Sequence, residues 1–148
     1  MATTSRRTAF IRELFRRMRD DTVLGGIGLT EGWPGDELEP EHVWLDDLDG
    51  EENFPVSMAG RVLRDDIFDV VLVCRSATEG ADRLDAMDRC ESYLNAIGSI
   101  VVASNMHGAI DGLVDVVTGD KRGPKSYPGP AGAEAFGRYV LNVHTRIS

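Results

Sequence analysis

Residues 61–75 read RVLRDDIFDVVLVCR, and this stretch decides the fold because it is the longest strand candidate in the chain. Side chains in a β-strand point alternately to opposite faces. Both faces are apolar here, since hydrophobic residues stand at even and at odd positions of the stretch. One face carries Phe68, Val70, Leu72 and Cys74, and the other carries Ile67, Val71 and Val73.

The two apolar faces predict that this strand is covered from both sides. A sheet in a small domain with few helices can cover only one of its faces by itself. We expect helices to cover the first face and a second copy of the chain to cover the other. The candidate residues of that subunit interface are Ile67, Val71 and Val73.

Two amphipathic helices are predicted, one on each side of this strand in the sequence. Residues 6–19 place apolar side chains at helical spacing, and Ser5 can cap their start. Residues 77–97 show a second apolar stripe, which follows the capping-box pattern SATE at residues 76–79. Gly98 is expected to end this second helix.

The remaining strand candidates complete an α+β fold. We expect a single mixed, mostly antiparallel β-sheet of about four to five strands, with the two main amphipathic helices packed on one face. Residues 1–148 are expected to form one domain, because a chain of this length can bury one core and is short for two. Besides the stretch above, the expected strands are residues 42–45, 100–103, 113–118 and 136–147.

Residues 119–137, GDKRGPKSYPGPAGAEAFG, separate the last two strand candidates. Their glycines and prolines predict a projecting loop over residues 119–135, longer than a hairpin connection needs. Such a loop either performs a function or is a plain solvent loop, and both alternatives stand. Basic and aromatic side chains on a projecting arm suit contact with a partner protein, and the candidates are Lys121, Arg122, Lys125 and Tyr127.

The charge is unevenly distributed. The net charge is −9, and residues 21–60 hold eleven acidic side chains and no Lys or Arg. An acidic surface argues against a nucleic-acid clamp, since phosphate binding needs clustered cations. The acidic candidates for an exposed surface or a channel wall are Asp46, Asp47, Asp49, Glu51 and Glu52.

No residue pattern indicates catalysis or a bound cofactor. The histidines His42, His107 and His144 are scattered, and no nucleophile elbow, phosphate-binding loop or dinucleotide fingerprint is present. Residues 45–56 match a calcium loop only in part, because Leu and Val stand where the two anchoring carboxylates belong. We therefore expect no enzyme activity, no catalytic residue, no metal and no cofactor.

Neither secretion nor membrane insertion is indicated. The longest apolar runs are far shorter than the roughly 20 residues that cross a bilayer, and no apolar segment follows the N-terminal arginines. Cys74 and Cys90 stand at apolar positions of a strand and a helix, so we expect buried thiols in a reducing compartment.

The order of these segments resembles the tail terminator (tail-to-head joining) proteins of long-tailed bacteriophages, the lambda-type terminator family. The resemblance lies in the arrangement of segments along nearly the whole chain and carries no catalytic or metal-binding residue. The segments that carry it are TAFIRELFRRMRDD, VLGGIGL, RVLRDDIFDVVLVC, ATEGADRLDAMDRCESYLNAI and FGRYVLNVHTRI. The acidic residues 36–52 and the long segment 119–137 depart from the family's layout.

The resemblance implies a structural virion protein at the neck, where head and tail join. It implies a homo-hexameric ring that caps the tail tube, ends its polymerisation and meets the head-completion or connector protein. Genomic DNA would pass through the centre without sequence-specific binding, and assembly would take place in the host cytoplasm, away from membranes.

Other classes of protein remain open from the sequence. Another neck ring protein, such as a head-completion or adaptor subunit, would also be small, acidic and without a catalytic site. A small α+β ligand-binding regulatory domain would instead contain an apolar pocket. A metal-dependent hydrolase would use the carboxylates between Asp46 and Glu52.

Overall fold

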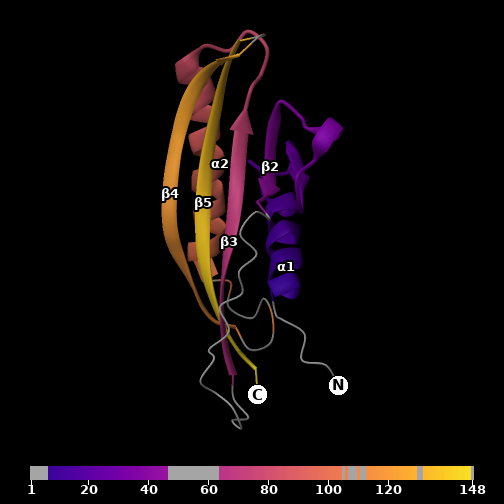
Figure 1. Ribbon diagram of the computed structural model, residues 1–148, viewed down its shortest axis with the longest axis vertical. Helices are drawn as coiled ribbons and strands as arrows, with labels where there is room; N and C mark the ends of the chain where they lie inside the picture. The colour runs from indigo at the N-terminus through magenta and orange to yellow at the C-terminus, as the bar shows by residue number, and fades with distance from the viewer. Residues whose placement is uncertain are drawn as a thin grey trace.

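The computed structural model describes residues 7–46, 64–104, 106, 110, 113–129 and 132–147. Within these ranges the chain forms one sheet with two helices on one of its faces, which confirms the expected α+β fold (Figure 1). The elements in chain order are α1 (Arg7–Asp20), β1 (Gly28–Thr30), the 3-10 turn η1 (Gly35–Glu37), β2 (Glu41–Leu45), β3 (Arg64–Ser76), α2 (Arg83–Ser104), β4 (Leu113–Gly129) and β5 (Gly132–Ile147).

The sheet is mixed and mostly antiparallel, with the strand order β1-β2-β3-β5-β4. Among the described strands only β1 and β2 are parallel, while β2 with β3, β3 with β5, and β5 with β4 are antiparallel. The stretch that opened the sequence analysis is therefore the central strand, which pairs with β5 along its full length, from Arg64 opposite Ile147 to Ser76 opposite Ala135. β1 and β4 form the two edges of the sheet.

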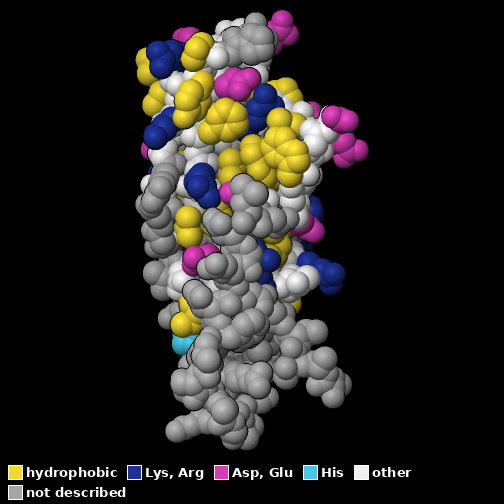
Figure 2. All heavy atoms as spheres, in the orientation of Figure 1, with side chains coloured by type: hydrophobic (Ala, Val, Ile, Leu, Met, Phe, Trp, Pro, Cys, Tyr) yellow, Lys and Arg dark blue, Asp and Glu magenta, His cyan; other side chains and the backbone are white. Residues whose placement is uncertain are grey.

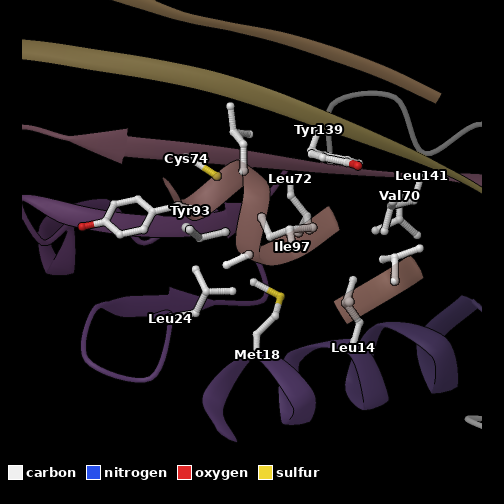
Figure 3. Packing of buried hydrophobic residues seen from close by; sticks show 14 of the residues in the cluster. Leu14, Met18, Leu24, Val70, Leu72, Cys74, Tyr93, Ile97, Tyr139 and Leu141 are labelled. Carbon is white, nitrogen blue, oxygen red and sulfur yellow. The ribbon is translucent and has the colours of Figure 1, made fainter. Parts of the chain in front are cut away.

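The hydrophobic core lies between the sheet and the two helices. Phe10 of α1 packs edge-to-face on Phe68 of β3, with ring centroids 6.2 Å apart. Figure 3 shows Leu14 and Met18 of α1 pointing toward the strands and toward Ile97 of α2. The same face of the sheet contributes Val43, Leu45, Phe68, Val70, Leu72, Cys74, Tyr139, Leu141 and Val143 to this core, all of them buried.

Helix α1 agrees closely with the expected residues 6–19, but α2 begins and ends later than residues 77–97. The SATE pattern does not start a helix, because the hydroxyl groups of Ser76 and Thr78 both donate to the carboxylate of Glu41 on β2. The Asp82 carboxylate accepts a hydrogen bond from the backbone N–H of Asp85 and so caps the helix instead.

The strand expected at residues 100–103 is wrong, because α2 continues through Ser104. Gly98 does not end the helix; it stands where the helix lies close to β5. A Cβ atom at Gly98 would lie 3.0 Å from the Tyr139 hydroxyl oxygen. Val101 remains buried one turn later, so the apolar run belongs to the buried side of the helix.

The projecting loop expected at residues 119–135 is also wrong, because β4 and β5 form one long antiparallel hairpin there. β4 is an edge strand, so its outer side needs no ladder partner and tolerates Pro124 and Pro128. The register shifts between Thr118 and Lys121 and between Arg122 and Lys125, and these bulges absorb residues that fit no regular ladder.

Candidate functional site

The face of the sheet turned away from the helices is the candidate functional surface, which we call the open face. In Figure 1 β4 and β5 pass in front of α2, so the viewer looks at this face. The pairing register places alternate residues of each strand on the open face, where each residue lies opposite or diagonal to one on a neighbouring strand. They are Trp44 and Asp46 beside β3, Ile67, Asp69, Val71, Val73 and Arg75 of β3, Glu134, Phe136, Arg138, Val140 and Asn142 of β5, and Lys125 and Tyr127 of β4.

The three residues predicted for a subunit interface all lie on the open face. Ile67 is 40% exposed, while Val71 and Val73 are partly buried. Val140 of β5 stands directly opposite Val71 and extends the apolar strip across two strands. The sequence alternation therefore predicted the face of the sheet on which these side chains lie, and their role in a subunit interface stays a prediction.

Two ion pairs join charged side chains on the open face. Arg138 bonds the Asp46 carboxylate at 3.1 Å, and Arg75 lies 3.4 Å from the Glu134 carboxylate. Such pairs carry little net charge, so a partner could cover them without burying an unpaired ion. A surface of apolar residues with internally paired charges is suited to protein contact.

Two tryptophans pack together on the β2 side of the open face. Trp33, in the loop between β1 and β2, packs edge-on against Trp44 with ring centroids 5.3 Å apart. Trp44 is 8% exposed as a result, whereas Trp33 itself is 65% exposed. An exposed indole held in place by a buried one is the kind of side chain that dominates protein interfaces.

His42 fixes the loop that carries Trp33. Its Nδ1 accepts a hydrogen bond from the Glu39 backbone N–H at 3.0 Å, and its Nε2 lies 3.0 Å from the Thr30 hydroxyl oxygen. The Thr30 hydroxyl donates to the Gly32 carbonyl, so Nε2 carries the proton and the ring is neutral. Burial lowers the pKa of His42, which favours this neutral form.

The residues expected on a partner-contact loop are divided between the two faces of the hairpin. Lys121 lies on the helix side, where its Nζ bonds the Asn95 side-chain oxygen at 3.0 Å. Lys125 and Tyr127 lie on the open face, and Tyr127 packs near Phe136 with ring centroids 6.1 Å apart. Arg122 stands opposite Arg138 in the ladder.

Of the acidic candidates, only Asp46 lies within the described residues. Its ion pair with Arg138 makes it part of the open face rather than a separate acidic surface. Asp47, Asp49, Glu51 and Glu52 lie outside the described residues, as does the hydrolase alternative that depended on them.

A second polar cluster joins β2, the β3–α2 turn and α2. The Glu41 carboxylate accepts hydrogen bonds from Ser76, Thr78 and Tyr93 side chains and from the Ala77 backbone N–H, at 2.6 to 3.0 Å. Burial alone would raise the pKa of Glu41, but these hydrogen bonds outweigh it and hold the pKa below its ordinary value. Glu41 lines an open cavity, yet its oxygens are already occupied, so the cluster serves to hold elements together.

Two features of the described residues bear on metal binding and on nucleophilic chemistry. No set of three or more His, Cys, Asp or Glu side chains among them could hold a metal ion. Cys74 and Cys90 are buried free thiols, and burial raises the pKa of Cys90 to about 12. A thiol with such a pKa stays protonated at neutral pH and is a poor nucleophile. No described helix is long and apolar enough to cross a membrane.

Sequence reasoning missed several residues of the open face, among them Phe136 and Arg138, and it missed Trp33 beside that face. Alternation along the expected strand 136–147 puts Phe136 and Arg138 on one face, but only the pairing of β5 with β3 sets them beside Arg75 and Val73. Trp33 gave one signal, a large aromatic residue in a segment rich in Gly and Pro.

Comparison with known proteins identifies the fold and no family. No family model matches the chain, and no curated protein matches it in sequence. A chain in the solved structure entitled "Virion of native gene transfer agent (GTA) particle" is similar to it, with a TM-score of 0.66 and 13% sequence identity. The alignment covers 97% of this chain and 99% of that chain, so the likeness extends over nearly every element of both folds.

Proposed function

We propose that this protein is a structural subunit of a virion, in the neck of a long-tailed phage-like particle. The single observation that carries the proposal is the fold shared with a chain of the gene transfer agent virion, over almost the full length of both chains. The open face supports it, because a sheet face with exposed apolar side chains suits a subunit that works in an assembly.

Within the neck we propose a tail terminator. Copies of the chain form a homo-hexameric ring that caps the tail tube, ends its polymerisation and joins it to the head-completion or connector protein. A head-to-tail interface that closes on itself would cover the open face of every copy, including Ile67, Val71 and Val73. The protein acts without catalysis, a metal or a cofactor.

The net charge of −9 fits a channel through which genomic DNA passes. Phosphates are repelled by a negative wall, so the DNA slides without sequence-specific binding. The location follows from the proposed role: the neck of the virion, after assembly in the host cytoplasm.

The test is electron microscopy of the purified protein, alone and mixed with tubes of the tail tube protein encoded with it. We expect rings with sixfold symmetry, and rings at one end of each tube that stop further growth. A ring that binds heads but leaves tube growth unchanged would favour a head-completion or adaptor subunit. A monomer that attaches to neither would contradict a neck function altogether.

A further inference from the structure

The loop between β1 and β2 forms an acidic lobe at one edge of the sheet. The lobe consists of Trp33, Asp36, Glu37 and Glu39, and no Lys or Arg lies between Asp20 and Gly60. Asp36 and Glu37 are exposed on the 3-10 turn η1, beside the 65% exposed indole of Trp33. The lobe thus presents an aromatic side chain next to negative charge.

The opposite edge of the sheet carries a recess of complementary character, which we call the notch. It has a volume of about 260 Å³ and is lined by Gly123, Lys125, Tyr127, Phe136, Gly137 and Arg138. Tyr127 and Phe136 form an aromatic wall, and the exposed Lys125 stands at its side. Arg138 is already paired with Asp46, so Lys125 supplies the positive charge.

The size of the notch selects among possible occupants. Pockets for drug-sized ligands take roughly 300–1,000 Å³. The notch is smaller and suits one aromatic side chain. An indole can stack on the aromatic wall and lie near Lys125, whose ammonium group is attracted to its electron-rich face.

The lobe and the notch lie at opposite edges of one sheet, because β2 and β4 are separated by β3 and β5. Figure 2 shows Asp and Glu side chains on the lobe at the right of the upper half, and Lys and Arg side chains along the left border. Because β3 and β5 stand between the strands that carry them, the two patches are placed for contact between copies. They meet when copies stand side by side in a head-to-tail arrangement, which closes into a ring.

We propose that Trp33 of one copy enters the notch of the next copy, with Asp36 and Glu37 facing Lys125. This rests on the proposed ring and names the contact that closes it. The contact joins the β1–β2 edge of one copy to the β4–β5 edge of the next. It has an aromatic centre and a charged rim, which is the usual anatomy of a protein interface.

Charge reversal tests the contact by sedimentation velocity over a range of concentrations. Lys125→Glu makes both patches acidic, and Asp36→Lys with Glu37→Lys makes both basic, so each variant should need at least about tenfold more protein to assemble. Mixing the two variants should restore assembly, because copies alternate around a ring with an even number of subunits. Combining all three substitutions in one chain should restore it as well.

The matched control is Glu79→Lys with Asp88→Lys, which changes the net charge as much as the double lobe variant but lies on exposed positions near and on α2. This control should assemble as readily as the wild type, and circular dichroism should show that every variant is folded. If the charge-reversal variants of the lobe and of the notch all assemble as readily as the wild type, the lobe–notch contact is wrong, while the ring itself stands. A wild type that sediments as a monomer at every concentration would overturn both the contact and the ring.

Discussion

His42 is a buried imidazole whose hydrogen bonds require its neutral form, and this makes stability depend on pH. Its folded pKa is lowered, so the unfolded chain binds the proton more strongly. We expect the contribution of His42 to the free energy of unfolding to be fully present above pH 6.5. This contribution should fall as the pH drops through 6.5 toward the folded pKa. The slope from one such proton is at most about 1.4 kcal/mol per pH unit.

Urea denaturation of the wild type and of His42→Gln at pH 7.5 and 5.5 measures this dependence. The informative quantity is the difference in pH slope between the two proteins, because every other titrating group is common to both. The variant should show the shallower slope. Equal slopes would mean that His42 is protonated as easily in the folded state as in the unfolded chain.

Tyr93→Phe tests the cluster around Glu41. The Tyr93 hydroxyl donates to the Glu41 carboxylate at 2.8 Å and joins α2 to β2. Removing a hydrogen bond to a charged acceptor should cost about 1.5–3 kcal/mol in the free energy of unfolding at pH 7, measured by urea denaturation. In a Glu41→Gln background the same substitution should cost less, and an unchanged cost would assign the effect to packing of the ring.

At the scale of single residues, the sequence predicted what depends on local alternation. It placed Ile67, Val71 and Val73 together because side-chain direction in a strand follows from position alone. It did not predict the hydrogen bond between His42 and Thr30, because the parallel pairing of β1 with β2 brings these two residues together.

At the scale of elements, the two faces of β3 have different roles. Substituting aspartate for one residue on each face distinguishes these roles. Phe68 is 3% exposed and packs on Phe10, so Phe68→Asp should bury a charge in the core and abolish the cooperative unfolding transition. Val71→Asp lies on the open face and should leave folding largely intact while weakening self-association. Circular dichroism during heating and sedimentation velocity separate the two outcomes, and matching behaviour of the variants would remove the distinction between the faces.

The two hairpin strands show why element boundaries were harder to predict than side-chain faces. Residues 119–129 contain the glycines and prolines of a loop, yet they form the edge strand β4, because only one side of an edge strand must pair. Edge position is a property of the whole sheet and leaves no local signal. The late end of α2 has the same origin, since Gly98 is explained only by Tyr139 of β5.

At the scale of the whole molecule, two electrostatic effects act on assembly in opposite directions. Each copy adds a net charge of −9 to a growing ring, and this repulsion acts over long range. The proposed contact of the acidic lobe with Lys125 is attractive and short. Salt weakens both, but it weakens the long-range repulsion more, since the Debye length falls from about 30 Å at 0.01 M to about 8 Å at 0.15 M.

We therefore expect assembly to become stronger, by a few-fold in the association constant, as salt rises from about 0.01 M to 0.15 M. Sedimentation velocity at the two salt concentrations measures the change. Glu79→Lys with Asp88→Lys lowers the net charge from −9 to −5, since each reversal removes a negative charge and adds a positive one, and leaves the lobe and the notch intact. This variant should respond less to salt than the wild type. Assembly that weakens with salt in both proteins would mean that short-range ion pairs outweigh the net charge, and that the acidity of the chain does not oppose the ring.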